Sequence, residues 1–183
     1  MRLDRNKSHL LIVDMQERMV PTVRKSEQVT ERCLRLIRIA QRLEVGITLS
    51  EQYPTGLGRT IGPIGEAAAD ATRIGKLHFS CWSDDRFRGH LRDLHRSGES
   101  QIVIAGVETH VCLGLTVLDL LANGFETFVV GDAVSARSKT VHKLAIERMR
   151  QAGARILDSE SVLFEWLQKA GTPEFKELIK LIK

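Results

Sequence analysis

Six short runs rich in apolar and β-branched residues recur along the chain, and segments with helical periodicity separate them. Strands that alternate with helices in this way form a parallel sheet that the helices cover. The predicted fold class is therefore α/β. The predicted strands cover residues 9–15, 46–51, 73–77, 101–107, 127–132 and 154–157.

The stretch between the first two predicted strands places apolar residues at steps of three and four, which puts them on one face of a helix. Cys33 belongs to this face, so we expect it in the core, and Ser26 is the expected N-cap residue. Residues 52–65 form a long irregular segment, and such segments often carry function. Further helices are predicted over residues 84–97, 109–123, 138–152 and 159–170.

The chain has 183 residues, 43% hydrophobic and 27% charged, which is enough for one domain with a sizeable core. We expect a single domain over residues 1–183, with its core over about 8–165 and a C-terminal helical extension over about 172–183. The formal net charge is +4, but lysines and arginines alternate with acids along the predicted helices. This pattern indicates solvated helix faces, so we predict no nucleic-acid partner.

The three cysteines, at positions 33, 81 and 112, have unrelated spacings, and the N-terminal residues contain no long apolar run. Both features favour free thiols in a reducing compartment, so we expect a cytoplasmic protein. Every apolar stretch is only as long as a strand and is interrupted by charges, so we predict no membrane association.

Two charged residues lie at or near the ends of predicted strands, where open α/β sheets bind their ligands. Asp14 ends an otherwise apolar run, where a lone buried carboxylate would be costly; its alternative role is a turn or helix cap. Lys76 lies within the strand predicted over 73–77 and either shields a sheet edge or needs a counter-charge. The two residues would satisfy each other if the fold brings their strands together.

Cys112 follows the strand predicted over 101–107 by a short turn and opens a helix that is apolar on most faces. A thiol in the first turn of a helix lies beside unpaired N–H groups and the positive end of the helix dipole, which favours the thiolate. A free cysteine is more often a small buried hydrophobe. The placement after a strand and a turn favours the role of nucleophile over that alternative.

Four motifs follow one another along the chain: LIVDMQ at 11–16, GKLHFS at 75–80, GVETHVC at 106–112 and GDAVSAR at 131–137. In this order and at these separations they resemble the isochorismatase-like cysteine hydrolase family. The resemblance runs from about residue 8 to about residue 165. The segment SEQYPTGLG at 50–58 is similar in particular to the YcaC-related, isochorismatase domain-containing subgroup.

The resemblance implies a three-layer α/β/α, Rossmann-like hydrolase fold with a six-stranded parallel sheet in the order 3-2-1-4-5-6. It also implies a catalytic triad of Asp14, Lys76 and Cys112, in which the thiolate attacks a carbonyl carbon. The backbone N–H groups of Glu108 and Cys112 would form the oxyanion hole, with a cis peptide bond between Val107 and Glu108. The implied enzyme is a hydrolase that cleaves a small amide, carbamoyl or ureido-type substrate.

Metal-binding relatives carry an Asp-x-His pair and a further histidine in the loop after the second strand, where this chain has SEQYPTG. None of the six histidines forms such a pair there, so we predict no metal. The GLGRTI segment lacks the third glycine of a dinucleotide-binding turn, so we predict no other cofactor. Retention of Cys112 argues for acyl chemistry rather than for cleavage of isochorismate.

Five residues just beyond predicted strand ends are candidates for a small substrate pocket, with loop packing as the alternative. Asp132 is expected to brace the cysteine turn or to cap the next helix, and Arg137 to serve structure or a subunit contact. The five pocket candidates are Gln16, Gln52, Tyr53, Phe79 and Trp82.

The C-terminal segment places its apolar residues on one helical face, which is expected to dock on the protein's own body or on a neighbouring subunit. The resemblance implies a homo-oligomer, a dimer or larger. The alternative function is a non-catalytic binding or scaffold protein, or a protein in which Cys112 is a redox-sensitive thiol. Covalent chemistry at Cys112 distinguishes these functions.

Overall fold

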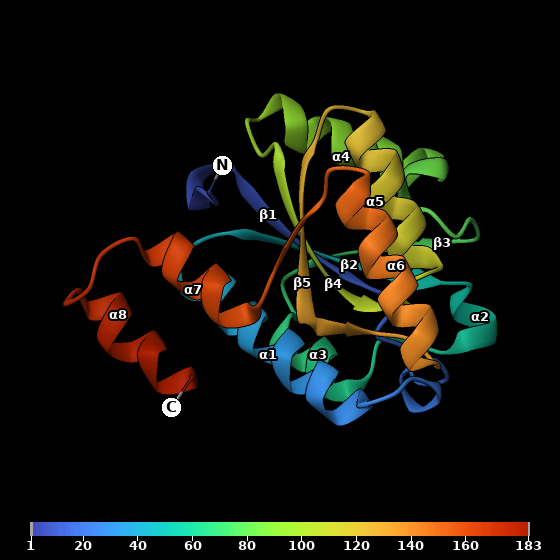
Figure 1. Ribbon diagram of the computed structural model, residues 1–183, viewed down its shortest axis with the longest axis horizontal. Coiled ribbons are helices and arrows are strands. Elements are labelled where there is room, and N and C mark those ends of the chain that lie inside the picture. Colours follow the sequence, from blue (N-terminus) through green and yellow to red (C-terminus); the bar gives the residue numbers. More distant parts are fainter. Residues whose placement is uncertain (1, 183) are drawn as a thin grey trace.

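The computed structural model describes residues 2–182 and contains one six-stranded parallel sheet (Figure 1). The order across the sheet is β3-β2-β1-β4-β5-β6, so the predicted fold class and strand order are confirmed. The strands are β1 (Ser8–Val13), β2 (Gly46–Gln52), β3 (Thr72–Lys76), β4 (Gln101–Val107), β5 (Glu126–Ser135) and β6 (Arg155–Leu157).

Helices cover both faces of the sheet and complete the three layers (Figure 1). One face carries α1, α3 and α7, and the other carries α4, α5 and α6. The α-helices are α1 (Ser26–Arg42), α2 (Pro54–Leu57), α3 (Gly62–Ala67), α4 (Asp85–Arg96), α5 (Cys112–Ala122), α6 (Lys139–Gln151), α7 (Ser159–Leu167) and α8 (Pro173–Leu178). Short 3-10 helices cover Arg5–Lys7, Val20–Thr22, Cys81–Ser83 and Ile179–Leu181.

Strand β1 shows why the sheet needs a helical layer on each side. Successive side chains of a strand point to opposite faces. Leu10 and Ile12 pack into the core beneath α1 and α7, whereas Leu11 and Val13 pack into the core beneath α4 and α5. All four side chains are buried, as expected for a central strand of a parallel sheet.

Helix α1 buries the face predicted for it, and Cys33 lies in the core as expected. The expected cap by Ser26 is wrong. The capping position belongs to Lys25, whose backbone is left-handed at φ 53° and whose side chain makes no capping hydrogen bond. Because Ser26 is already the first helical residue, its hydroxyl does not occupy the place from which a cap accepts.

The C-terminal extension docks on the protein's own body. Leu178 of α8 is buried in the core cluster that lies beneath α1 and α7. Arg42 of α1 holds the same segment through ion pairs with Glu174 at 3.7 Å and Glu177 at 2.6 Å. The structure therefore favours intramolecular docking over a subunit contact for this segment. Lys183, the last residue of the predicted extension, lies outside the described residues, as does Met1.

No helix between residues 2 and 182 combines the length and the apolar character that a membrane crossing requires.

Candidate active site

Three strand ends bring Asp14, Lys76 and Cys112 to one edge of the sheet. Asp14 directly follows β1, Lys76 is the last residue of β3, and Cys112 is the first residue of α5, just after β4. Parallel strands all end at the same edge, which is where ligands of open α/β sheets bind. The three residues are 0%, 2% and 2% exposed, respectively, so the group they form is closed to solvent in this conformation.

Asp14 and Lys76 form a buried ion pair, with 3.0 Å between Lys76 Nζ and Asp14 Oδ2 and neither side chain exposed. Lys76 Nζ also donates to Gln52 Oε1 at 2.7 Å and to the carbonyl oxygen of Phe79 at 3.0 Å, which uses all three donors of an ammonium group. Burial acts to lower the pKa of Lys76, but the charge of Asp14 opposes it, and the pKa lies above its ordinary value. The amine therefore remains a cation.

The position of Lys76 combines the two interpretations that the sequence allowed. Strand β3 is an edge strand, as the shielding interpretation requires. However, the Lys76 side chain is turned inward onto Asp14 and is fully buried. A lysine lies at this place because the buried Asp14 carboxylate and the ammonium group neutralise each other, and not because the sheet edge needs protection.

Ser50 of β2 fixes the carboxylate of Asp14 from the other side. Ser50 Oγ donates to Asp14 Oδ1 at 2.5 Å, and the Asp14 N–H lies 3.2 Å from both Ser50 Oγ and the Ser50 carbonyl oxygen. Ser50 and Lys76 thus hold one oxygen each of the Asp14 carboxylate. Sequence reasoning missed Ser50, although a hydroxyl near the carboxyl end of a predicted strand was a signal.

Cys112 lies beside this pair, with its Sγ 3.7 Å from Gln52 Oε1. Burial is the main cause that raises the pKa of the Cys112 thiol far above its ordinary value; the Asp14 carboxylate raises it further, and Lys76 opposes both. The expectation that the helix N-terminus favours the thiolate is therefore wrong for the closed site, because desolvation outweighs it. The resting thiol keeps its proton and needs a base to lose it.

The turn that leads into Cys112 contains the expected cis peptide bond between Val107 and Glu108. Its conformation is held from the end of β5 and the segment that follows: the Thr109 N–H donates to the Ser135 carbonyl oxygen at 2.8 Å, and Arg137 Nε donates to Glu108 Oε2 at 3.0 Å. Among the hydrogen bonds of residues 2–182, neither the N–H of Glu108 nor that of Cys112 has an acceptor. Two backbone donors therefore remain available in this turn.

Arg137 has a structural role, since its guanidinium neutralises the buried Glu108 carboxylate of the cysteine turn. Asp132 neither braces that turn nor caps α6, so its predicted role is wrong. Its carboxylate accepts from the N–H of Ser159 at 2.8 Å and from Ser159 Oγ at 2.7 Å, at the start of α7. The reason is that β5 continues past Asp132 to Ser135, which directs Asp132 to the α7 side of the sheet.

The five pocket candidates occupy different environments. Gln52 contacts both Lys76 and Cys112 and is the one that the structure brings into the triad. Gln16 donates through Nε2 to the carbonyl oxygens of Gln52 and Gly58, and its Oε1 accepts from the Gln52 N–H, so its amide serves loop packing.

The three aromatic candidates also differ in their surroundings. Trp82 packs edge-on against Phe125, with ring centroids 5.9 Å apart, and carries the guanidinium of Arg92 on its face. This environment favours a packing role for Trp82. Tyr53 and Phe79 are 51% and 56% exposed, and they lie just beyond the ends of β2 and β3, next to Gln52 and Lys76.

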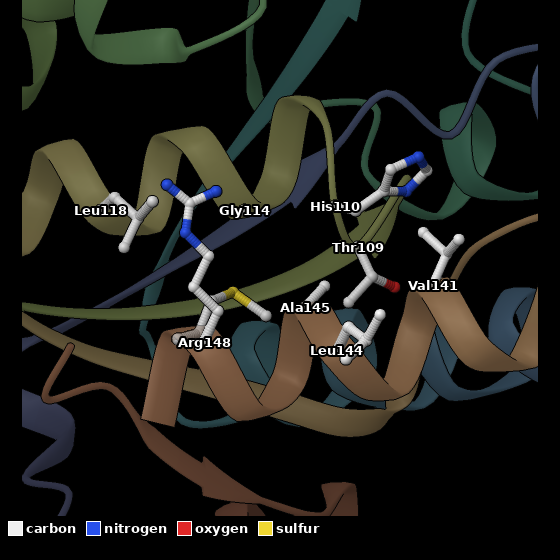
Figure 2. Close-up of a pocket in the computed structure, with 9 residues that line it drawn as sticks. Thr109, His110, Gly114, Leu118, Val141, Leu144, Ala145 and Arg148 are labelled. Atoms are coloured by element: carbon white, nitrogen blue, oxygen red, sulfur yellow. The ribbon is translucent and has the colours of Figure 1, made fainter. Parts of the chain in front are cut away.

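A cavity of about 300 Å³ lies between α5 and α6, next to the cysteine turn. Figure 2 shows Thr109 and His110 at one end of this cavity and Leu118 and Arg148 at the other. Its lining includes none of Asp14, Lys76 and Cys112, so it is not the pocket of the triad.

No group of three or more histidine, cysteine, aspartate or glutamate side chains within residues 2–182 is arranged to hold a metal ion. The absence of a metal and of any other cofactor remains a prediction.

Cys81 is a second buried thiol beside the site. Its N–H donates to Thr116 Oγ1 at 2.9 Å, and the same hydroxyl donates to the carbonyl oxygen of Cys112 at 2.6 Å. Burial is the main cause that raises the pKa of Cys81 to about 11; Lys76 opposes it and Asp14 adds to it. Cys81 therefore stays protonated in the folded protein at pH values where an unfolded thiol has ionised.

Replacing Cys81 with alanine is expected to reduce the amount by which the free energy of unfolding falls as the pH becomes alkaline. The folded pKa of about 11 lies above the ordinary value of 9.0, so the stability contributed by this thiol is complete below pH 9.0 and is lost as pH rises through about 11. Within that window each pH unit removes about 1.4 kcal/mol from the free energy of unfolding. Urea unfolding of both proteins across this range should show their difference shrinking at that rate, and a constant difference would contradict the assignment.

The chain is similar to known proteins over most of its length. The family model described as isochorismatase domain matches residues 8–161. The chain is 36% identical to isochorismatase domain-containing protein 2A of Mus musculus over 177 residues, which cover 96% of this chain and 82% of that protein. It is 33% identical to isochorismatase family protein 1B of Dictyostelium discoideum over 178 residues, which cover 96% and 86% of the two chains.

Solved structures share the fold over nearly the whole chain. MAR1 ribonuclease from Caenorhabditis elegans superposes with a TM-score of 0.91 at 32% identity, covering 100% of this chain and 92% of that one. YcaC from Pseudomonas aeruginosa, solved with hexane-2,5-diol and covalent acrylamide, has a TM-score of 0.90 at 27% identity, covering 98% and 91%. YcaC from Escherichia coli, described as an octameric hydrolase of unknown specificity, has a TM-score of 0.90 at 26% identity, covering 99% and 90%.

Proposed function

The chain belongs to the isochorismatase domain family, and on that premise we propose that it is a metal-independent cysteine hydrolase. The proposed substrate is a small amide, carbamoyl or ureido compound, which is cleaved through an acyl-thioenzyme on Cys112. One observation carries the proposal: a buried, protonated thiol lies in the same closed site as a carboxylate that a buried ammonium group and a hydroxyl hold in place.

In the first half of the reaction, Asp14 takes the proton of Cys112 as the thiolate attacks the carbonyl carbon of the substrate. An S–C bond forms, and the carbonyl electron pair moves onto the oxygen. The N–H groups of Glu108 and Cys112 are the proposed donors to this oxyanion. When the tetrahedral intermediate collapses, the C–N bond breaks, and the amine or ammonia leaves with the proton that Asp14 returns.

In the second half, water attacks the carbonyl carbon of the thioester and Asp14 takes the proton of that water. The S–C bond breaks, the acid product leaves, and Cys112 regains its proton. Lys76 stays charged throughout and stabilises first the Asp14 carboxylate and then the thiolate. Gln52 is proposed to orient Lys76 and to contact the substrate, because its amide oxygen lies between Lys76 Nζ and Cys112 Sγ.

The covalent acrylamide in the YcaC structure from Pseudomonas aeruginosa supports the assignment of a nucleophile in this family. Acrylamide combines an amide with an electrophilic carbon that thiolates attack.

Three large apolar side chains are exposed at the edge of the sheet that carries Asp14, Lys76 and Cys112. Tyr53, Leu77 and Phe79 are exposed and lie just beyond the ends of β2 and β3. We propose that they contact the substrate or a neighbouring subunit, as parts of a homo-oligomer. The octameric state described for YcaC from Escherichia coli supports the oligomer. The three cysteines are free, which supports a reducing compartment such as the cytoplasm.

Two other functions are less well supported. A redox-sensing thiol is typically a solvent-accessible thiolate of low pKa, whereas Cys112 is buried and its pKa is raised. Ribonuclease activity is named for the neighbour from Caenorhabditis elegans, but the acyl-thioenzyme proposed here forms on a carbonyl carbon, which the phosphodiester linkage of RNA lacks. RNA is therefore tested as a comparison beside the panel of amide, carbamoyl and ureido compounds.

The alkylation rate of Cys112 tests the proposal without a known substrate. Asp14→Asn removes a charge that raises the pKa of Cys112 and leaves Lys76, so iodoacetamide should modify Cys112 faster, by at least about tenfold. Lys76→Met removes the opposing charge and should slow the reaction by a similar factor. The rates are read from Cys112-containing peptides by mass spectrometry.

Cys33 is the internal control in the same experiment, because it lies buried on the other face of the sheet. Because Lys76→Met also lowers the stability of the fold, the Cys33 rate measures how much alkylation comes from opening of the fold, and each Cys112 rate is compared relative to it. Unchanged rates at Cys112 in both variants would refute the triad. Asp14→Asn should also show no turnover of any panel member despite its faster alkylation, because the base is gone.

A further inference from the structure

A second cavity of about 370 Å³ lies at the carboxyl end of β5, between the first turns of α1 and α6. Three segments line it: residues 24–29, 131–136 and 139–143. Asp14, Lys76 and Cys112 are not among its lining residues, so it is separate from the proposed catalytic site. The mechanism uses none of its side chains.

Four cations surround this cavity: Arg24, Lys25, Lys139 and Lys143. None of the four has a carboxylate within 4.0 Å among residues 2–182. The one acid in the lining, Asp132, is already bound by Ser159 and paired with Arg32 at 3.3 Å. The cavity thus concentrates positive charge that the described residues do not neutralise.

Two of the four cations lie at the start of α6, where positive charge is unfavourable unless an anion is bound. Lys139 is the first residue of α6, at the positive end of the helix dipole, where acids are preferred, and α6 has no acid in its first turn. Lys143 is one turn further on, and like charges four residues apart repel each other on a helix. Burial and the charge of Lys25 both lower the pKa of His142 in the same lining, so the cationic field reaches into the cavity.

The backbone that carries these charges is held in place. The Arg24 N–H donates to the Ala136 carbonyl oxygen at 3.1 Å, and Ser135 Oγ donates to the Arg24 carbonyl oxygen at 2.6 Å. The helix capping positions at Lys25 and Ser138 make no side-chain capping hydrogen bond. All four cations are exposed, so a ligand reaches them without rearrangement of the fold.

We propose that this cavity binds a small phosphate-bearing molecule. Phosphate oxygens accept hydrogen bonds from lysine and arginine and from the free N–H groups of helix N-termini, and their charge offsets the repulsion among the cations. A volume of about 370 Å³ admits a small organic phosphate but not a folded macromolecule. A cluster that breaks the local rules of charge placement twice without internal compensation is expected at a functional site.

Pyrophosphate is the probe, titrated calorimetrically into the purified full chain at constant ionic strength. Saturable binding of one pyrophosphate per chain is expected. The variant Lys139→Ala/Lys143→Ala should bind at least about tenfold more weakly, a cost of about 1.4 kcal/mol. The control Lys176→Ala/Lys180→Ala removes the same two charges, also four residues apart and exposed, from the C-terminal segment, and should bind as the wild type does.

Thermal unfolding gives an independent readout, because the melting temperatures of the two double variants should respond differently. Without phosphate, Lys139→Ala/Lys143→Ala should melt at a higher temperature than the wild type, because repulsion at the start of α6 is relieved. Pyrophosphate should raise the melting temperature of the wild type and of the control variant but not that of Lys139→Ala/Lys143→Ala. Cys112→Ser should still bind pyrophosphate, so failure of the phosphate-binding proposal can be distinguished from failure of the proposed hydrolase function.

Four outcomes would overturn the proposal. One is the absence of saturable binding up to about 10 mM pyrophosphate. Another is equal weakening in both double variants, which would mean unspecific attraction. A third is much tighter binding of a mixed-sequence RNA through the same two lysines, which would make the cavity part of a nucleic-acid surface. The last is a change in oligomer mass in Lys139→Ala/Lys143→Ala without pyrophosphate binding, which would make the surface a contact between copies.

Discussion

Cys112→Ser is expected to lower turnover of a cleaved carboxamide, carbamoyl or ureido compound by about 10³-fold or more, because loss of the nucleophile removes the covalent route altogether. Intact-mass measurement during turnover should show the wild type carrying the acyl group of the substrate and the variant carrying none. A serine hydroxyl in the same place is less acidic than the thiol. Asp14, the buried base proposed to activate the nucleophile, therefore removes its proton less readily.

The matched control for this experiment is Cys33→Ala. Cys33 is buried like Cys112, but it packs on the opposite face of the sheet, with its Sγ 3.8 Å from the Ala133 carbonyl oxygen. The control variant should keep both the adduct and the turnover once its folding is verified. An adduct that persists in Cys112→Ser, or turnover within about tenfold of the wild type, would assign the chemistry to another group.

Lys76→Met is expected to destabilise the fold by about 3–5 kcal/mol at neutral pH, because it leaves the buried carboxylate of Asp14 without its counter-charge. The methionine keeps most of the volume of the lysine side chain, so the loss reports on charge rather than on a cavity. Urea unfolding of the variant and of the wild type gives the difference in the free energy of unfolding.

The double variant Asp14→Asn/Lys76→Met separates the ion pair from its surroundings. With both charges gone, most of the loss should be recovered, so the two single effects should be far from additive. The exposed pair Arg96–Asp93 is the control, and Arg96→Met should change the stability by less than about 1 kcal/mol. Additive effects at Asp14 and Lys76 would mean that the two residues do not stabilise each other.

Much of the secondary structure was predictable, because the two periodicities in the sequence are strong. The boundaries that moved did so for tertiary reasons. Strand β5 runs to Ser135 instead of ending near residue 132, because its pairing with β4 resumes beyond a register shift and reaches Val107. Helix α5 begins at Cys112 instead of near residue 109, because residues 108–111 form the turn with the cis peptide bond.

The supporting residues of the site were harder to find than the triad itself. Ser50 and Thr116 are hydroxyls in largely apolar segments, and their importance depends on partners 36 and 35 positions away, respectively. Arg137 belongs to a motif that was singled out, but its partner, Glu108, is 29 positions away. A sequence shows that such a residue is polar among apolar neighbours, but it does not show which distant group the residue meets.

The difference between what the sequence predicts and what the folded structure adds is clearest at Cys112, Asp14 and Lys76. The amino-acid sequence was enough to predict that each residue lies at or next to the carboxyl end of a strand, because strands and helices follow from local periodicity. The 3.0 Å contact between Lys76 Nζ and Asp14, and the burial and protonation of the thiol, became known from the folded structure. Proton affinity depends on desolvation and on charges from other strands, and the chain acquires both only when it folds.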